Sequence, residues 1–434
     1  MWAFAYSLLL VLAWPWVHLR LRWRARKEPA YAERIPERFG HVPDTVPSGC
    51  VWFHTVSAGE TIAAAGLIRE LADHFPGRPF LVTTMTPTGS GQVRERLAGR
   101  VYHCYAPYDF PFAVRRFYDA VQPRLLVLME TELWPNLIGE AHRRNVPVVL
   151  VNGRLSAASA RGYARLGGFT RKMLGRLRWV ACQYDDHRRR FESLGVPPER
   201  LLVHGSVKFD AALPPDHGER VDALRRRWRL ADAPVWIAAS THPGEETVVL
   251  DAHARLLRRH PGLRLIVVPR HPARSDEVAA LCRDRGFTCG RQSRSDDDGG
   301  SAVILGDTMG ELLYLYGLAD IAFVGGSLVT VGGHNPIEPA LCGVPIVMGP
   351  EVFNFIEVVA RFREAECLEL VAGTDELVAS IARVLACPEV RSAAGARARS
   401  VVDANSGARD RLFGLLEQEI RACDGAAAVP GGQT

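Results

Sequence analysis

Short apolar runs alternate with amphipathic segments along most of the chain. The runs at 50–56, 80–84, 125–129 and 146–151 have the length and composition of buried strands. Between them apolar residues recur every three or four positions, as in 61–75, which is typical of a helix with one buried face. This alternation predicts parallel sheets whose strands are joined by crossover helices.

A Pro- and Gly-containing stretch at 205–219 interrupts the pattern and divides it into two halves. After it, apolar runs predict strands at 235–239, 263–268, 302–305, 321–324 and 344–348, and a helix at 309–318. We therefore predict an α/β fold of two doubly wound, Rossmann-like domains that face each other across a cleft. The expected division is 28–211 for the first domain, 212–425 for the second and 426–434 for a disordered tail.

The first 27 residues predict an N-terminal membrane anchor. Residues 2–17 are apolar except for Ser7 and Pro15, and five basic residues follow by Lys27. As a helix, 2–17 would span about 24 Å, short of the roughly 30 Å hydrocarbon core. A secretory signal peptide has its positive charge ahead of the apolar run and a small-residue cleavage site behind it, neither of which occurs here. We expect an uncleaved anchor that spans the membrane or lies at its interface, with the remaining chain in the cytoplasm. An apolar helix docked on the body of the protein is a compatible alternative.

The charge of the chain is concentrated in this segment. The net charge is +5, and residues 1–27 contain five basic and no acidic residues, so the rest of the chain is balanced. Nothing in the body therefore indicates nucleic-acid binding. With 47% hydrophobic and 23% charged residues, whole-chain disorder and a polytopic membrane protein are excluded. The nine cysteines occur singly, which favours reduced thiols over a disulfide framework or a zinc site.

Several classes of enzyme are disfavoured because their motifs are missing from the sequence. There is no P-loop, no HExxH metal-binding helix and no GxSxG nucleophile motif. Gly89-Ser90-Gly91 begins a dinucleotide fingerprint, but Arg94 replaces its third glycine, so a plain loop is the better interpretation. Asp296-Asp297-Asp298 contains a DxD triplet within a stretch typical of a solvated loop, and we predict no metal site there.

Glu60 is a candidate catalytic carboxylate. It follows the strand predicted at 50–56, at the carboxyl end where such folds bind ligands. Ser57 and Glu60 have the S-x-x-E spacing of a helix capping box. Glu60 is therefore either a helix cap or a base that accepts a proton from an attacking hydroxyl.

Two further candidates in the first half are Glu130 and Lys208. Glu130 and Glu132 directly follow the apolar run 125–129, and carboxylates that end a buried strand are costly unless they are hydrogen-bonded or functional. Lys208 lies at the junction of the two halves. It is either a solvated lysine or the partner of an acidic group on a substrate.

The second half carries candidate nucleotide-binding residues at its strand ends. Arg270 ends a strand and is a natural partner for a phosphate or carboxylate. Pro336 is well placed as a first helical residue, so the helix start behind Asn335 offers free N–H groups to a phosphate. Glu338 is positioned either to accept hydrogen bonds from ribose hydroxyls or to complement the helix dipole. Gly310 and Glu311 begin another predicted helix.

Ten motifs give the chain a resemblance to a known family. In chain order they are RIPERFG, HTVSAGE, ETELWPN, VNGRLS, GSVKFD, STHPGEE, PRHP, GDTMGEL, VGGSLV and GGHNPIEPA. With the apolar and basic segment in front, the chain resembles the 3-deoxy-D-manno-oct-2-ulosonic acid (Kdo) transferases of Gram-negative bacteria over nearly its whole length. The stretch 291–301 contains none of these motifs.

The resemblance implies a GT-B glycosyltransferase that uses no metal and no cofactor. The implied reaction is an inverting transfer of Kdo from CMP-Kdo to a lipid A precursor, lipid IVA, at the cytoplasmic face of the inner membrane. It implies that Glu60 is the general base and that Glu130 and Lys208 stabilise the transition state. The CMP site that it implies comprises Pro269, Arg270, Met309, Gly310, Glu311, Asn335, Pro336, Ile337 and Glu338.

Other functions remain open at this level. A GT-B transferase that uses a UDP-sugar would reveal itself by a preference for uridine nucleotides. A nucleotide-sugar epimerase of the same fold would need no lipid acceptor, which the predicted anchor argues against. A non-catalytic membrane-associated module would leave the clustered carboxylates unexplained.

Overall fold

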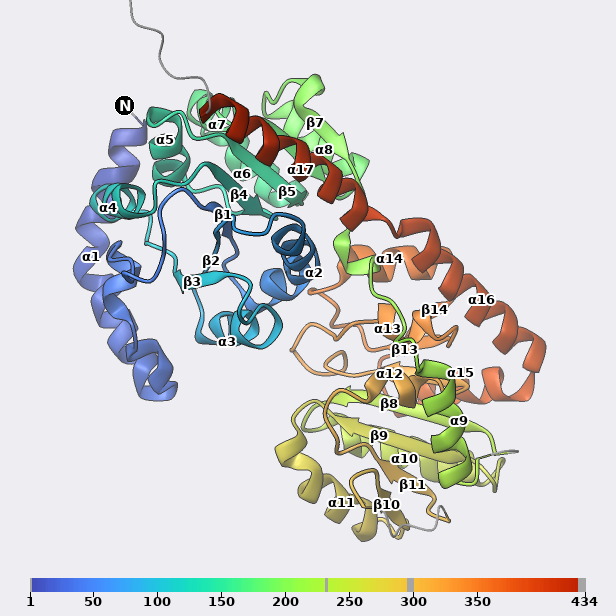
Figure 1. Ribbon diagram of the computed structural model, residues 1–434. Coiled ribbons are helices and arrows are strands. Elements are labelled where there is room, and N and C mark those ends of the chain that lie inside the picture. Colours follow the sequence, from blue (N-terminus) through green and yellow to red (C-terminus); the bar gives the residue numbers. More distant parts are fainter. Residues whose placement is uncertain (1, 231–232, 295–299, 428–434) are drawn as a thin grey trace, which may run out of the picture. The chain divides into compact units, whose positions relative to one another are not determined.

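The computed structural model describes residues 2–230, 233–294 and 300–427, which form two compact units (Figure 1). The first unit contains the chain up to Lys208 and the C-terminal segment from Ser406, and the second contains Phe209–Asn405. Each unit is built on one parallel seven-stranded sheet with helices between successive strands. The predicted pair of parallel-sheet α/β domains is therefore confirmed. The triplet Asp296-Asp297-Asp298 lies outside the described residues.

The first sheet has the strand order β3-β2-β1-β4-β5-β6-β7. Its strands are β1 (Val51–His54), β2 (Phe80–Thr84), β3 (Tyr102–Tyr105), β4 (Leu125–Met129), β5 (Val148–Gly153), β6 (Trp179–Cys182) and β7 (Leu201–Val203). In register, Val51 pairs with Phe80 on one side and Leu125 on the other. Alternate residues of a strand point to opposite faces, so Trp52 and Phe53 enter two separate cores.

Helices cover both faces of the first sheet. They are α2 (Ala58–His74), α3 (Pro87–Arg96), α4 (Pro111–Val121), α5 (Pro135–Arg143), α6 (Ala157–Arg165), α7 (Gly168–Leu174) and α8 (Asp185–Ser193). The N-terminal helix α1 (Trp2–Lys27) and the C-terminal helix α17 (Ala408–Ala427) belong to the same unit.

The second sheet has the order β10-β11-β9-β8-β12-β13-β14. Its strands are β8 (Val235–Thr241), β9 (Arg264–Pro269), β10 (Cys289–Arg291), β11 (Val303–Leu305), β12 (Ile321–Val324), β13 (Ile346–Met348) and β14 (Leu368–Leu370). Its helices are α9 (His217–Arg227), α10 (Glu245–Leu257), α11 (Ser275–Asp284), α12 (Leu312–Tyr316), α13 (Ile337–Leu341), α14 (Ile356–Glu364), α15 (Thr374–Ala386) and α16 (Pro388–Asn405).

The last helix departs from the expected domain boundary at residue 425. Helix α17 buries Leu412, Leu416 and Ile420, spaced one turn apart, in the core beneath α2 of the first unit. Residues 406–425 therefore belong to the first unit, because that core receives the apolar stripe of α17. Apart from its first two residues, which continue α17, the predicted disordered tail 426–434 lies outside the described residues.

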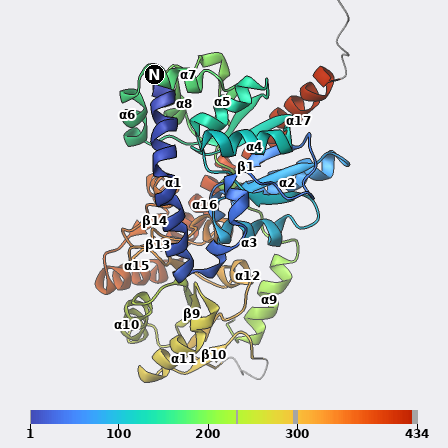
Figure 2. The ribbon, with the colours of Figure 1, turned by 90° about the vertical axis from the view of Figure 1, so that its left-hand side faces the viewer.

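The N-terminal helix α1 runs along the first unit as one continuous helix (Figures 1 and 2). The Tyr6 hydroxyl donates to Asp109 at 2.9 Å, and the His18 ring stacks on Phe39 with centroids 4.6 Å apart. The other side leaves Leu12 and Leu19 about two-thirds exposed. No helix in the described part of the chain is both long enough and apolar enough to cross a membrane, so the predicted single anchor is not confirmed.

Candidate active site

The first sheet changes direction between β1 and β4. From β1 the chain proceeds outward to β2 and β3, whereas β4 lies on the other side and leads to β5. Loops that leave two such strands diverge, and open α/β sheets bind ligands in the crevice at this point. The first turn of α2, which follows β1, carries Glu60, and the loop after β4 carries Glu130. The structure therefore brings these two predicted residues to one edge of the same sheet.

Glu60 is held by the start of helix α2. Its N–H donates to Ser57 Oγ at 3.2 Å, which confirms Ser57 as the helix cap. The carboxylate accepts from the Ser57 hydroxyl at 2.9 Å and from the Val56 N–H at 2.8 Å. The side chain is buried, and burial together with the neighbouring Glu132 and Glu130 raises the pKa of Glu60 to about 8. A carboxylate with this pKa can exchange protons near neutral pH.

The β4 loop supplies two further carboxylates. Glu130 adopts a left-handed backbone with φ of 52°, which is uncommon for a residue other than glycine and occurs often at functional sites. Its Oε2 lies 4.0 Å from Arg154 Nη1. Glu132 accepts a 2.9 Å hydrogen bond from Trp134 Nε1, and burial raises its pKa. Three carboxylates thus share one edge with a single arginine close to Glu130.

A neutral histidine, His54, packs against the loop after β4. The His54 side chain is buried at the end of β1, and burial lowers its pKa to about 3. Its ring packs edge-on against Trp134 with centroids 4.6 Å apart, and its Nδ1 lies 3.2 Å from Thr83 Oγ1. His54 therefore positions Trp134 rather than accepting a proton at neutral pH.

Lys208 is the last residue of the first unit before the chain enters the second unit. It lies half-buried in a short 3-10 turn, Val207–Phe209. The Val207 N–H lies 3.5 Å from Asn152 Oδ1, so the turn is placed beside the end of β5. Lys208 is therefore at the same edge of the first sheet as the carboxylates, beside β5, which is two strands along from β1.

In the second unit the change of direction falls between β8 and β12. Glu245, at the start of α10, joins the two loops that follow these strands. Its buried carboxylate accepts from the His242 N–H at 2.9 Å and from the N–H groups of Gly326, Ser327 and Leu328 at 2.7 to 3.0 Å. A Cβ on Gly325 would lie 2.7 Å from Ser240 O, so this close approach of the loops requires glycine.

The two joined loops hold a pair of histidines beside Arg270. His242 Nε2 lies 2.8 Å from His334 Nε2, and the two rings are stacked. Burial, His242 and Arg270 lower the pKa of His334 to about 4, so the pair is neutral at physiological pH. In the described part of the chain the Arg270 guanidinium makes no hydrogen bond or ion pair. Desolvation raises the pKa of the half-buried Glu338, and Arg270 lies close enough to offset part of this rise.

The start of helix α13 differs from the expected phosphate site. Pro336 is the capping residue rather than the first helical residue, and the helix has only five residues. The Ile337 N–H already donates to Asn335 Oδ1 at 3.1 Å, and Asn335 Nδ2 donates to Glu338 at 3.2 Å. The expected set of free N–H groups at this helix start is therefore reduced.

The β11 loop carries the remaining predicted donor residues. Met309 is exposed, and Gly310 has φ of 78°. Glu311 is the capping residue of α12, which begins at Leu312 and is shorter than the predicted helix. Its carboxylate accepts from Arg220 at 2.6 Å and Gln292 at 3.2 Å, and so it fixes this loop. Pro269 ends β9, beside β11 in the sheet.

Five residues in these loops had no role assigned from sequence. They are Glu132, Arg154, His242, Glu245 and His334. Each lies within one of the motifs that were singled out, so the spacing located them. Their roles depend on which side chains meet across different loops, which spacing along the chain does not show.

Comparison with known proteins identifies relatives over the whole chain. Residues 33–211 match the family described as 3-deoxy-D-manno-octulosonic-acid transferase (kdotransferase). The Haemophilus influenzae 3-deoxy-D-manno-octulosonic acid transferase is 39% identical over 421 residues, which cover 96% of this chain and 98% of that protein. The Bordetella pertussis protein of the same name is 36% identical over 94% and 96% of the two chains. A UDP-GlcNAc 2-epimerase from Neisseria meningitidis shares the fold, with a TM-score of 0.55 and 14% identity over 85% and 99% of the chains.

Proposed function

Because this chain belongs to the 3-deoxy-D-manno-octulosonic acid (Kdo) transferase family and is a Kdo transferase of lipopolysaccharide biosynthesis, we propose that it transfers Kdo from CMP-Kdo to the lipid A precursor lipid IVA. The observation that carries the mechanism is the Glu60 carboxylate, which is buried, has its pKa raised to about 8 and lies at the switch point of the first sheet.

In the proposed reaction Glu60 accepts the proton of an acceptor hydroxyl. The hydroxyl oxygen forms a bond to the anomeric carbon of Kdo while the bond from that carbon to the CMP phosphate oxygen breaks. A single displacement from the opposite side inverts the anomeric centre. Glu130 and Lys208 stabilise the transition state, and Lys208 pairs with the carboxylate of Kdo.

The second unit binds the donor in this proposal. Arg270 provides positive charge for the phosphate without a metal ion, and its exposed guanidinium has donors available for it. Glu338 accepts hydrogen bonds from the ribose hydroxyls, in a position that Asn335 fixes. The remainder of the CMP site comprises Pro269, Met309, Gly310, Glu311, Pro336 and Ile337. No cofactor is required, because CMP-Kdo already carries an activated sugar.

We also propose that α1 attaches the enzyme to the cytoplasmic face of the inner membrane. The exposed side of the helix carries Leu9, Leu12, Trp16 and Leu19, and exposed arginines lie further along it. An apolar stripe flanked by arginines suits the interface of an anionic leaflet. The hydrogen bond from Tyr6 to Asp109 keeps the opposite side on the protein.

The reaction is tested with purified lipid IVA and CMP-Kdo generated in situ, using the wild type and Glu60→Gln. A product heavier by one or more Kdo units, lost in Glu60→Gln, supports both the reaction and the base. Transfer that survives in Glu60→Gln would leave Glu60 as a helix cap alone. No transfer by folded wild type would overturn the donor or acceptor, and UDP-sugars would then be assayed.

A further inference from the structure

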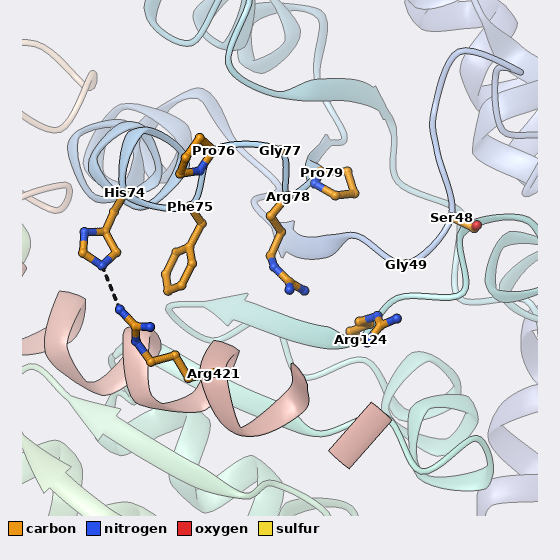
Figure 3. A pocket seen from close by; sticks show the side chains of 10 residues that line it. All are labelled: Ser48, Gly49, His74, Phe75, Pro76, Gly77, Arg78, Pro79, Arg124 and Arg421. Carbon is orange, nitrogen blue, oxygen red and sulfur yellow. Dashed lines mark hydrogen bonds between the residues drawn. The ribbon is translucent and has the colours of Figure 1, made fainter. Parts of the chain in front are cut away.

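A separate cavity of about 550 Å³ lies at the opposite edge of the first sheet from Glu60 (Figure 3). The loop before β1, the turn after α2, the residue before β4 and helix α17 form its walls. Strand β1 begins two residues after Gly49, which lines this cavity, and leads at its other end to helix α2, which carries Glu60. An occupant of the cavity would therefore not compete with the substrates proposed above.

Three arginines line this cavity, and no carboxylate is among its lining residues in the described chain. Arg78 pairs with Asp424, and Arg421 donates to Glu417 at 2.8 Å. Arg124 makes no side-chain hydrogen bond or ion pair with any residue that the structure describes. Arg78 lines the cavity from the turn after α2 and Arg124 from the residue before β4 (Figure 3). Guanidinium groups each carry five N–H donors, so these contacts leave several donors unused.

The turn that carries Arg78 is conformationally restricted. Arg78 N–H donates to Phe75 O at 3.1 Å, Pro76 occupies the second position, and Gly77 has φ of 85°. These are the features of a type II turn, in which proline and glycine are the favoured central residues. The guanidinium is therefore presented from a preorganised loop, and the Phe75 ring and Pro79 add an apolar wall.

We infer that this cavity binds a phosphate monoester or diphosphate group through Arg78, Arg124 and Arg421. A guanidinium group can donate two parallel hydrogen bonds to the oxygens of one phosphate. An anion between Arg78 and Arg124 also relieves the repulsion between these two positive charges. The volume is in the range of small-molecule sites, and the apolar wall suits the organic part of such a ligand. A soluble phosphorylated metabolite and a lipid headgroup share this chemistry.

The test measures binding of inorganic pyrophosphate to the full-length protein by calorimetry, with CMP in excess to fill any nucleotide site in the second unit. The variants are Arg124→Ala, Arg124→Lys and the control Arg165→Ala, which removes an exposed arginine of α6. A second arm measures binding to phosphatidylcholine vesicles containing phosphatidic acid. Hydrogen exchange of residues 75–79 reports whether the occupied site is this cavity.

Arg124→Ala is expected to weaken binding at least tenfold, Arg124→Lys less, and Arg165→Ala not at all. Arg124-dependent binding of pyrophosphate supports a soluble ligand. Dependence on Arg124 that appears only with vesicles supports a lipid headgroup. The inference is overturned if Arg124→Ala and Arg165→Ala both bind the two probes as the wild type does. It is also overturned if pyrophosphate leaves 75–79 unprotected and vesicle binding does not depend on Arg124.

Discussion

Ser57 and Glu60 hydrogen-bond to each other twice. The Glu60 N–H donates to Ser57 Oγ at 3.2 Å, and the Ser57 hydroxyl donates to Glu60 Oε1 at 2.9 Å. In an ordinary capping box the glutamate accepts from the backbone N–H of the cap, whereas Glu60 Oε2 accepts from Val56 at 2.8 Å. A carboxylate has about four acceptor positions, so two remain for a substrate hydroxyl. Helix capping and proton transfer are therefore compatible roles for Glu60.

Replacing Glu60 by glutamine is expected to lower kcat by about 100- to 10,000-fold, the usual contribution of a general base. The amide keeps the shape and can still accept from Val56, so the fold is retained. Single-turnover transfer to lipid IVA measures the effect, and Glu219→Gln, at an exposed glutamate of α9, is the matched control. Equal rates for the two variants would contradict the assignment.

The pH dependence of stability reports on the same carboxylate. The pKa of Glu60 is about 8 in the folded protein and about 4.5 ordinarily. Between these values the folded state binds more protons than the unfolded state, so this group's contribution to stability falls as pH rises. Above about pH 8 its contribution is constant. The free energy of unfolding of the wild type, relative to Glu60→Gln, should therefore fall between about pH 5 and 8, and a flat difference would show that Glu60 is not perturbed.

Activity should follow ionisation of Glu60. In the proposed mechanism kcat/KM rises with pH through about 8, because only the carboxylate accepts a proton. Ser57→Ala removes the hydrogen bond that favours the charged form, so this limb should move to higher pH. The Ser57→Ala substitution should also lower the free energy of unfolding by about 1 kcal/mol, because the helix loses its cap. Ser57→Thr keeps the hydroxyl and should restore both properties; a Ser57→Ala profile that overlays the wild type would exclude the coupling.

Arg270→Ala should raise KM for CMP-Kdo at least tenfold. The exposed guanidinium makes no hydrogen bond or ion pair in the described chain, so its loss should remove phosphate binding without lowering Tm. Tenfold corresponds to about 1.4 kcal/mol, a modest value for a charged hydrogen bond to phosphate. Steady-state kinetics at saturating acceptor measure the change. Arg258→Ala, at the end of α10, is the control and should leave KM unaltered.

The exposed stripe of α1 should determine membrane attachment. Replacing both Leu12 and Leu19, which are 68% and 66% exposed, by serine removes apolar surface without disturbing the core. Binding to anionic vesicles should weaken by at least tenfold while Tm is unchanged. Flotation of the protein with vesicles measures this, with Leu166→Ser in the first unit as control. Unaltered flotation of the double variant would assign attachment to another surface.

Much of the fold could be predicted from local pattern. The predicted runs at 80–84 and 125–129 are strands β2 and β4, and the helix expected at 61–75 is part of α2, which begins earlier, at Ala58, and ends at His74. Strands β3, β6, β7, β10 and β14 were missed, because each has only three or four residues and contains exposed or half-buried positions that interrupt the apolar pattern. Periodicity is a property of neighbouring residues, so it locates buried faces wherever an element has one.

The motifs likewise identified the loops of the candidate site, because strand ends and polar residues are visible in the chain itself. The structure alone showed that Glu132 raises the pKa of Glu60 and that Glu245 joins two loops. It also showed that Asn335 caps the N–H expected to be free, and that α17 packs on the first unit. The sequence thus determined the longer buried strands and the polar loops that follow them. Tertiary structure decided pKa values, capping partners and domain membership, since desolvation and hydrogen bonding depend on atoms brought close from distant parts of the chain.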